Sequence, residues 1–472
     1  MQNVTITETG GGVRVETGAW IVEHRAECGG AWTAISPMGN GGAGGLGRNL
    51  LTAPMSSALH CLDDVTGGES DYRERYDTRA KIRIEATSVI AEGVYRNARG
   101  EALPVGYRRR TEYAHPGLIW TTLEIMSDCG CPDVVELSVA MAELRSGLRE
   151  CHVALHPSQA GQPDLLGARG RFSMNAPTAF YSRFTPLQML CADDAGAGIE
   201  FLPGCDLAGW DGWRSKKGEP VELGLGMFRV GQGHDGYRVE LSPYCLRSRR
   251  IKTTVQGHLT FKLGIALGDA GDSTPAKSIR TFPITGAPDA VDFASITAQQ
   301  FDAVAIDTGA FEAARFGELI EAAHAHGLKI LATVSAHEFP LSDPEYAKYA
   351  RAWMHTAAPS LGLIQRFAGA KAASALMCLN SGWREHVESQ IGRILTENRW
   401  DGIAIEQAAA YPCCHPSHAG HGAGPFHSDL DGLIKLLSFC RKRSDVVVLK
   451  GAPRSFALCS FTDGAAYVSA HR

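Results

Sequence analysis

The sequence has neither an excess of charge of one sign nor a long apolar run. Its 472 residues include 46 Lys and Arg against 51 Asp and Glu, a formal net charge of −5. A chain without a basic excess is not expected to be a dedicated nucleic-acid binder. No window reaches the ~18 apolar residues that a membrane helix needs, so we expect a soluble protein with no membrane partner. The first residues, Met1–Glu8, lack the basic and apolar regions of a secretory signal.

Cysteines are too sparse for a disulfide scaffold. There are 13 of them, an odd number, and most stand singly in apolar runs. We interpret them as reduced, buried, small side chains and expect a cytoplasmic protein. The sequence also lacks a nucleophile elbow, a P-loop and a dinucleotide fingerprint, so we expect no cofactor.

The first half of the chain has the pattern of β structure. Up to residue 268, segments such as Gly12-Val-Arg-Val-Glu16 and Tyr237-Arg-Val-Glu-Leu241 alternate apolar and polar residues between glycines. Many short strands without intervening helices favour an antiparallel β-sandwich. We therefore predict a sandwich domain over residues 1–268, followed by a polar Gly/Pro/Ser linker over 269–278.

The second half, residues 279–472, has a different pattern. Apolar runs such as Gly402-Ile-Ala-Ile-Glu406 alternate with amphipathic segments such as Trp383–Asn398, which is typical of parallel βα units. We predict a catalytic (β/α)8-type barrel. We count about six strands where such a barrel has eight. Either strands at 361–364 and 375–379 belong to it, or the barrel is incomplete and its open edge is covered by the sandwich or by another copy in a homo-oligomer.

Reactive groups of such a barrel stand at the C-terminal ends of its strands. This rule selects Asp307, Glu338 and Glu406 as catalytic carboxyls, and it selects His337 and Lys450 as groups that orient the substrate. Glycoside hydrolysis needs paired carboxyls, because one protonates the leaving oxygen while another attacks the sugar or activates water. Helix capping is the alternative role for Asp307 and Glu338. An ion pair with a rim acid is the alternative role for Lys450.

One segment carries a family resemblance. Leu376–Glu406, LMCLNSGWREHVESQIGRILTENRWDGIAIE, followed by a Tyr-Pro-Cys-Cys loop, resembles glycoside-hydrolase barrels related to α-amylases, α-galactosidases and α-fucosidases. The resemblance places Asn380, Trp383 and Arg384 near the sugar, and Glu406 at the position of a strand-end aspartate that is often the nucleophile. Glutamate is one methylene longer, which leaves acid/base catalysis and hydroxyl binding open for Glu406. The first half is similar to the galactose-mutarotase-like supersandwich that precedes the barrel in several glycosidase families.

The loop over residues 411–427 is rich in histidine and cysteine. Its candidate metal ligands are Cys413, His415, His418 and His421, since thiolate and imidazole suit zinc. Their spacing matches no standard zinc finger, so the primary expectation is a loop without metal that covers the substrate, with His415 on the sugar.

The leading hypothesis is a glycoside hydrolase that acts on an oligosaccharide or glycoside. Two alternatives stay open. The first is a catalytically inactive carbohydrate-binding or scaffolding protein with the same fold. The second is a zinc-dependent enzyme that uses the loop over residues 411–427.

Overall fold

The computed structural model describes most of the chain and divides it into two compact units. The described residues are 4–17, 20–38, 48–62, 66–115, 117–145, 279–284, 291–308, 315–355, 374–408, 429–450, 455–459 and 461–466, residues 410, 413, 415, 417 and 418, and the strands β11 to β20. Unit 1 comprises Met1–Gly271 with Gly422–His427, and unit 2 comprises Asp272–His421 with Ser428–Arg472. Residues 270–278 of the predicted linker lie outside the described residues.

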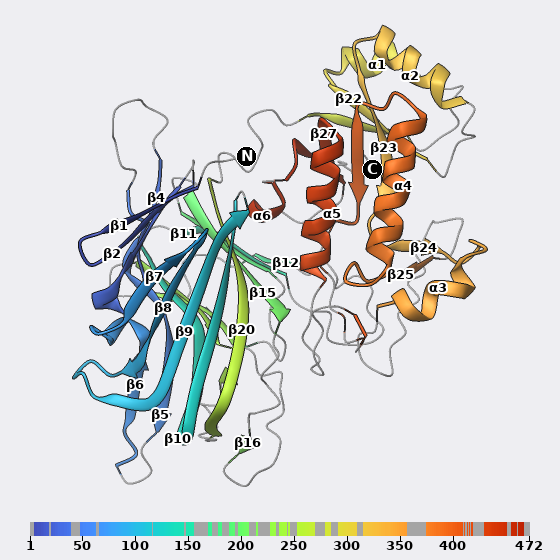
Figure 1. Ribbon diagram of the computed structural model, residues 1–472. Coiled ribbons are helices and arrows are strands. Elements are labelled where there is room, and N and C mark those ends of the chain that lie inside the picture. The colour runs from blue at the N-terminus through green and yellow to red at the C-terminus, as the bar shows by residue number, and fades with distance from the viewer. Residues whose placement is uncertain are drawn as a thin grey trace. The chain divides into compact units, whose positions relative to one another are not determined.

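Unit 1 consists of antiparallel strands (Figure 1). Their bounds are β1 Thr5–Thr9, β2 Gly12–Glu16, β3 Trp20–Arg25, β4 Trp32–Pro37, β5 Leu51–Leu62, β6 Glu69–Arg73, β7 Lys81–Glu85, β8 Ser88–Arg96, β9 Ala102–His115, β10 Leu118–Arg145, β11 Leu148–Ala154, β12 Arg169–Arg171, β13 Thr178–Tyr181, β14 Gln188–Asp193, β15 Ala197–Asp206, β16 Arg214–Ser215, β17 Met227–Gln232, β18 Gly236–Ser242, β19 Tyr244–Cys245 and β20 Thr253–Asp269. Two short 3₁₀ helices accompany them, η1 Ala26–Cys28 and η2 Glu74–Tyr76.

The long strand β10 belongs to two runs of strands. Its first part pairs with β9 and β20, and its second part pairs with β5 and β18. The pairing with β20 shifts register between Ser127 and Val134, where Gly130 and Asp133 have φ values of 74° and 76°. Such left-handed residues bulge a strand and let it bend. One hydrophobic cluster draws side chains from both runs, including Leu59 of β5 and Phe261 of β20. The predicted antiparallel, sandwich-like first half is confirmed.

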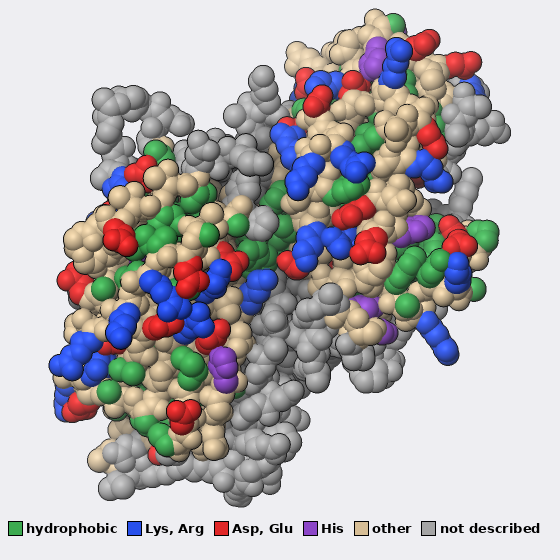
Figure 2. Space-filling model, in the orientation of Figure 1, with side chains coloured by type: hydrophobic (Ala, Val, Ile, Leu, Met, Phe, Trp, Pro, Cys, Tyr) green, Lys and Arg blue, Asp and Glu red, His purple; other side chains and the backbone are tan. Residues whose placement is uncertain are grey.

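The outer face of β7 to β10 carries ion pairs, while the inner face packs against the hydrophobic cluster. Arg83 pairs with Glu85 at 3.0 Å, and Arg108 pairs with Glu92 at 3.2 Å. Figure 2 shows acidic and basic side chains interspersed over the visible surface of this unit. Exposed pairs of this kind contribute less than about 1 kcal/mol each, so the apolar cluster is the main source of stability.

A buried ion pair joins Glu74 of η2 to Arg109 of β9. The Arg109 guanidinium contacts both carboxylate oxygens of Glu74, at 2.8 and 2.7 Å. The same carboxylate accepts hydrogen bonds from the backbone N–H and the hydroxyl of Ser57 at 3.0 and 2.8 Å. Because every partner is desolvated, removing one of them would leave an uncompensated buried charge.

Unit 2 contains a six-stranded parallel sheet whose strands follow chain order. The strands are β21 Thr281–Ile284, β22 Ala303–Asp307, β23 Lys329–Ser335, β26 Gly402–Glu406, β27 Val446–Lys450 and β28 Gly464–Ala466. The helices are α1 Phe293–Ala298, α2 Phe316–Ala325, α3 Tyr346–Trp353, α4 Trp383–Glu397, α5 Leu430–Arg443 and α6 Phe456–Cys459. Helix α4 has the predicted amphipathic pattern, with Val387 and Ile391 buried, and it lies beside α5 (Figure 1).

The parallel βα units are confirmed, but the described strands do not form a complete eight-stranded barrel. Within the described part of unit 2, β21 and β28 are the edges of the sheet and pair with β22 and β27 only. The candidate strand at 375–379 overlaps β25, Ser374–Leu376, which pairs antiparallel with β24, Glu338–Pro340, in a separate two-stranded sheet. The other candidate, at 361–364, lies outside the described residues.

A search of the described residues finds no helix with the length and apolar character needed to span a bilayer.

Candidate functional site

The parallel sheet places several predicted site residues along one edge. Asp307 ends β22, Glu406 ends β26 and Lys450 ends β27. Glu406 is in register with Ser335 of β23 on one side and with Lys450 on the other. The apolar residues that precede each of them fill the sheet interior, so the first polar side chains emerge at the C-terminal edge.

Glu338 lies just beyond the end of β23, above this edge. Its backbone N–H donates to the hydroxyl of Ser335 at 3.1 Å, and its carboxylate accepts a hydrogen bond from the Gln407 side chain. Burial raises the pKa of Glu338, and the negative charges of Glu406 and Asp307 raise it further, against the hydrogen bonds from Gln407 and Ser374 that lower it. The three carboxyls predicted to be catalytic are therefore electrostatic neighbours.

Gln407 is a site residue that the sequence reasoning missed. It follows Glu406 directly and has a φ of 55°, a left-handed conformation that is uncommon for a residue with a side chain. Its backbone N–H donates to the carbonyl of Lys450 at 3.2 Å, and its side chain reaches Glu338. No motif or spacing marks this glutamine, because the contact depends on how β26 ends.

Lys450 forms an ion pair with Glu406 across the two neighbouring strands. The side chains are only 17% and 34% exposed, respectively. This contact confirms the ion-pair alternative for Lys450. A cation at this place holds one carboxylate in a defined position.

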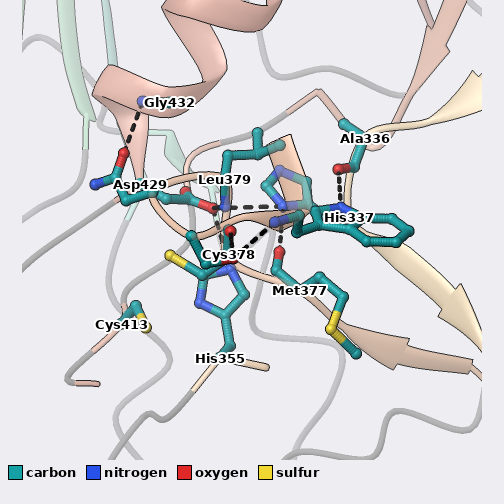
Figure 3. Close-up of polar contacts among 12 residues, drawn as sticks. Ala336, His337, His355, Met377, Cys378, Leu379, Cys413, Asp429 and Gly432 are labelled. Carbon is teal, nitrogen blue, oxygen red and sulfur yellow. Dashed lines mark hydrogen bonds and ion pairs between the residues drawn. The ribbon is translucent and has the colours of Figure 1, made fainter. Parts of the chain in front are cut away.

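His337 and Asp429 belong to a buried polar cluster next to this edge (Figure 3). The Nδ1 atom of His337 lies 3.1 Å from the carbonyl oxygen of Met377 and 3.4 Å from Oδ2 of Asp429. The same Oδ2 lies 3.1 Å from Nε2 of His355 and accepts a hydrogen bond from the Leu379 N–H at 3.1 Å. Burial alone would lower the pKa of His355, but the Asp429 carboxylate and the Cys413 thiol together outweigh it and raise the pKa to about 10.

The three residues predicted to lie near the sugar, Asn380, Trp383 and Arg384, have intramolecular partners. Trp383 is 2% exposed, donates from Nε1 to the carbonyl of Ala336 at 2.8 Å, and packs against Phe339. Asn380 accepts a hydrogen bond from the Gly432 N–H at 2.8 Å. Arg384 lies 3.4 Å from the Glu388 carboxylate, one turn further along α4. Contacts of Asn380, Trp383 and Arg384 with a sugar stay predictions.

The histidine- and cysteine-containing loop is described in part. Cys413 is buried, and its Sγ lies 3.3 Å from Nδ1 of His418, whose Nε2 contacts the Ala352 carbonyl at 2.8 Å. The His415 ring stacks on that of His418, with centroids 4.2 Å apart, so its predicted sugar contact also stays a prediction. His421 lies outside the described residues.

Two residues far from the loop in sequence lie beside Cys413. One nitrogen of His355 and the sulfur atoms of Cys378 and Cys413 all lie within 4.8 Å of one another, and all three residues are buried. The sequence reasoning missed His355 and Cys378 because each stands alone, with no ligand spacing around it. The contact with Cys378, together with those with His355 and His418, lowers the pKa of the Cys413 thiol.

Comparisons with known proteins give structural matches. No family model matches the chain, and no curated protein matches its sequence. A GH36 alpha-galactosidase from Geobacillus stearothermophilus is similar over 98% of this chain and 75% of its own, with 9% identity and a TM-score of 0.46. An alpha-galactosidase from Lactobacillus brevis is similar over 98% and 72%, with 8% identity and a TM-score of 0.42.

An alpha-N-acetylgalactosaminidase from Bifidobacterium bifidum is similar over 97% of this chain and 78% of its own, with 10% identity and a TM-score of 0.38. These neighbours are glycosidases.

Proposed function

We propose that this chain is a glycoside hydrolase whose carboxyl groups at the C-terminal edge of the parallel sheet cleave a glycosidic bond. The observation that carries the proposal is that two neighbouring carboxyls, Glu338 and Glu406, lie in opposite environments. Burial and like charge raise the pKa of Glu338, whereas Glu406 is held in an ion pair with Lys450. Two neighbouring carboxyls in such different environments are suited to separate roles, one as the acid and the other as the nucleophile or base.

In this mechanism Glu338 donates its proton to the glycosidic oxygen as the bond to the anomeric carbon breaks and its electron pair moves to that oxygen. The Glu406 carboxylate, or a water molecule that it activates, attacks the anomeric carbon. Lys450 positions Glu406, and Asp307 adds negative charge that helps Glu338 keep its proton. His337, one residue before Glu338, is buried against Met377 and Asp429 and positions the segment that carries the acid.

The test uses the purified chain with aryl glycosides of both anomers and with natural oligosaccharides. These include stachyose and raffinose, which are bound in structures of GH36 alpha-galactosidases. Glu338→Gln and Glu406→Gln should each reduce turnover by roughly 10²–10⁴-fold, the usual contribution of acid–base catalysis. Glu318→Gln, at an exposed position of α2, is the matched control and should retain activity. Wild-type turnover in both site variants would reject the mechanism.

The Glu406–Lys450 ion pair also favours a second candidate, a protein that binds carbohydrate without cleaving it. A carboxylate neutralised by lysine is a weaker nucleophile, and the pair offers complementary hydrogen-bonding groups to sugar hydroxyls. Calorimetric titration with the same sugars separates the candidates. Heat of binding without product formation supports the second candidate, and product formation supports the first.

The proposal extends to the architecture of unit 2 and to the cellular location of the protein. We take the six-stranded sheet as an incomplete (β/α) barrel, because its strands are parallel and follow chain order as barrel strands do. A cytoplasmic location is proposed from the sequence, because its 13 cysteines, an odd number in a long chain, lack the density of a disulfide scaffold.

A further inference from the structure

We propose that His355, Cys378, Cys413 and His418 form a closed, tetrahedral zinc site that stabilises unit 2. The site is distinct from the carboxyl groups at the sheet edge and is independent of the proposed hydrolase activity. Each of the four residues is at most 4% exposed, as expected for a structural zinc site rather than a catalytic one with an open position.

The separations between the donor atoms of His355, Cys378 and Cys413 suit a single ion. Zinc binds sulfur at about 2.3 Å and imidazole nitrogen at about 2.0–2.1 Å, so its tetrahedral ligand atoms lie about 3.5–4 Å apart. The donor atoms of His355, Cys378 and Cys413 already lie within 4.8 Å of one another. Nδ1 of His418 lies 3.3 Å from Sγ of Cys413 but is not within 4.8 Å of all three of these atoms, so the His418 ring would move toward the ion to supply the fourth ligand.

Both histidines are oriented in the way that metal sites require. Nε2 of His355 lies 3.1 Å from the Asp429 carboxylate, and Nε2 of His418 lies 2.8 Å from the Ala352 carbonyl. An acceptor on one ring nitrogen holds the proton there and directs the lone pair of the other nitrogen toward the metal. In both rings, Nδ1 is then the atom that binds zinc.

The donor set favours zinc on chemical grounds. Two thiolates neutralise the charge of Zn²⁺, and two neutral imidazoles complete a Cys2His2 set of borderline-soft ligands. Calcium and magnesium prefer oxygen ligands. No oxygen atom is needed in this set, because the Asp429 carboxylate acts through His355 instead of contacting the ion.

The proposed site ties together segments that are distant in sequence. His355 follows α3, Cys378 lies between β25 and α4, and Cys413 and His418 belong to the loop that follows β26. That loop begins just after Glu406 and Gln407. A metal that closes such long stretches of chain reduces the freedom of the unfolded state, and its binding energy contributes directly to folding.

The first experiment measures the metal content of the full chain. The protein is produced with zinc in the medium, freed of any affinity tag and passed over a desalting column, and zinc is quantified against protein by mass spectrometry. We expect about one zinc per chain, as a four-ligand site holds one ion. Cys378→Ala and Cys413→Ala should each lose it. Cys440→Ala, at a buried cysteine of α5 outside the cluster, should keep it.

Clearly sub-stoichiometric zinc in the wild-type chain, both as purified and after incubation with zinc under reducing conditions, would overturn the proposal. So would a Cys378–Cys413 disulfide found by peptide mapping of the purified protein, or retention of zinc by both cysteine variants.

A second measurement uses the wild-type chain, so it tests the proposal even if the ligand variants fail to fold. Wild-type chain from which zinc has been exchanged for cobalt should show thiolate-to-cobalt charge transfer and the intense visible bands of a tetrahedral site. The weak spectrum of six-coordinate cobalt would contradict the proposed ligand set. Removal of the metal with a chelator should also lower the unfolding temperature of the wild-type chain, whereas an unchanged unfolding temperature after loss of zinc would contradict the stabilising role.

Discussion

Lys450, the last residue of β27, forms an ion pair with Glu406, the last residue of the neighbouring strand β26. The parallel register brings the two together, since both follow four buried residues in strands of equal length. A lysine at this point holds the carboxylate of Glu406 in one orientation. The pair therefore links the register of the sheet to the geometry of the proposed active site.

Lys450→Met should lower kcat/KM by about 10²-fold, the scale of loss when a reacting group is misplaced by about 1 Å. Lys450→Arg keeps the charge and should recover part of the activity. Steady-state kinetics on the substrate identified by the screen, with circular dichroism as a check on folding, measures the effect. Full activity of Lys450→Met would show that Lys450 has no positioning role.

Asp307→Asn should change the pH dependence of the proposed hydrolase. Because the negative charge of Asp307 contributes to the raised pKa of Glu338, removing that charge should lower the pKa of the acid. Glu338 must be protonated to act, so the alkaline limb of the kcat/KM profile should move to lower pH. The control is Glu318→Gln, whose profile should match that of the wild type. A shift of the alkaline limb to higher pH would contradict this assignment.

Arg109→Met should destabilise unit 1 by about 3–5 kcal/mol, because it leaves the buried Glu74 carboxylate without its cation. The adjacent Arg108 provides a matched control, since its side chain lies on the outer face and pairs with Glu92 at 3.2 Å. Arg108→Met should cost less than about 1 kcal/mol. Urea unfolding of the three proteins tests the difference, and equal midpoints for the two variants would reject it.

Gly432→Ala should disturb the start of α5. A Cβ at this position would lie 2.3 Å from the carbonyl oxygen of Leu379 and 2.8 Å from Oδ1 of Asn380, so the Asn380 hydrogen bond to the Gly432 N–H would be displaced. We expect a loss of about 1–3 kcal/mol, the scale of overpacking in a core. Gly392→Ala, in α4, meets its nearest neighbour at 3.7 Å and should be neutral or stabilising by up to about 1 kcal/mol. Thermal unfolding compares the two, and a Gly432→Ala protein as stable as the wild type would contradict the close approach.

The sequence by itself determined that the first half forms antiparallel strands and the second half a parallel sheet. It also determined where the strands of the parallel sheet end. Alternating residues such as those of β2 bury one face, and continuous apolar runs such as Gly402–Glu406 bury both, so each pattern selects antiparallel or parallel structure locally. The same runs place Glu406 and Lys450 at strand ends, because the first polar residue after a buried strand must emerge at an edge. Helix α4 was predictable from the amphipathic pattern of its segment, in which Val387 and Ile391 are buried.

Only the tertiary structure decided which residues meet. His355 and Cys378 lie beside Cys413 because three separate connections between strands and helices meet in space. No local pattern in the sequence indicates which connections meet. The buried position of Trp383 depends on Phe339 and Ala336, which come from another βα unit. The hydrogen bond from Gln407 to Glu338 follows from a left-handed turn at the end of β26. Contacts of this kind depend on packing between distant segments, whereas sequence patterns report only the burial of neighbouring residues.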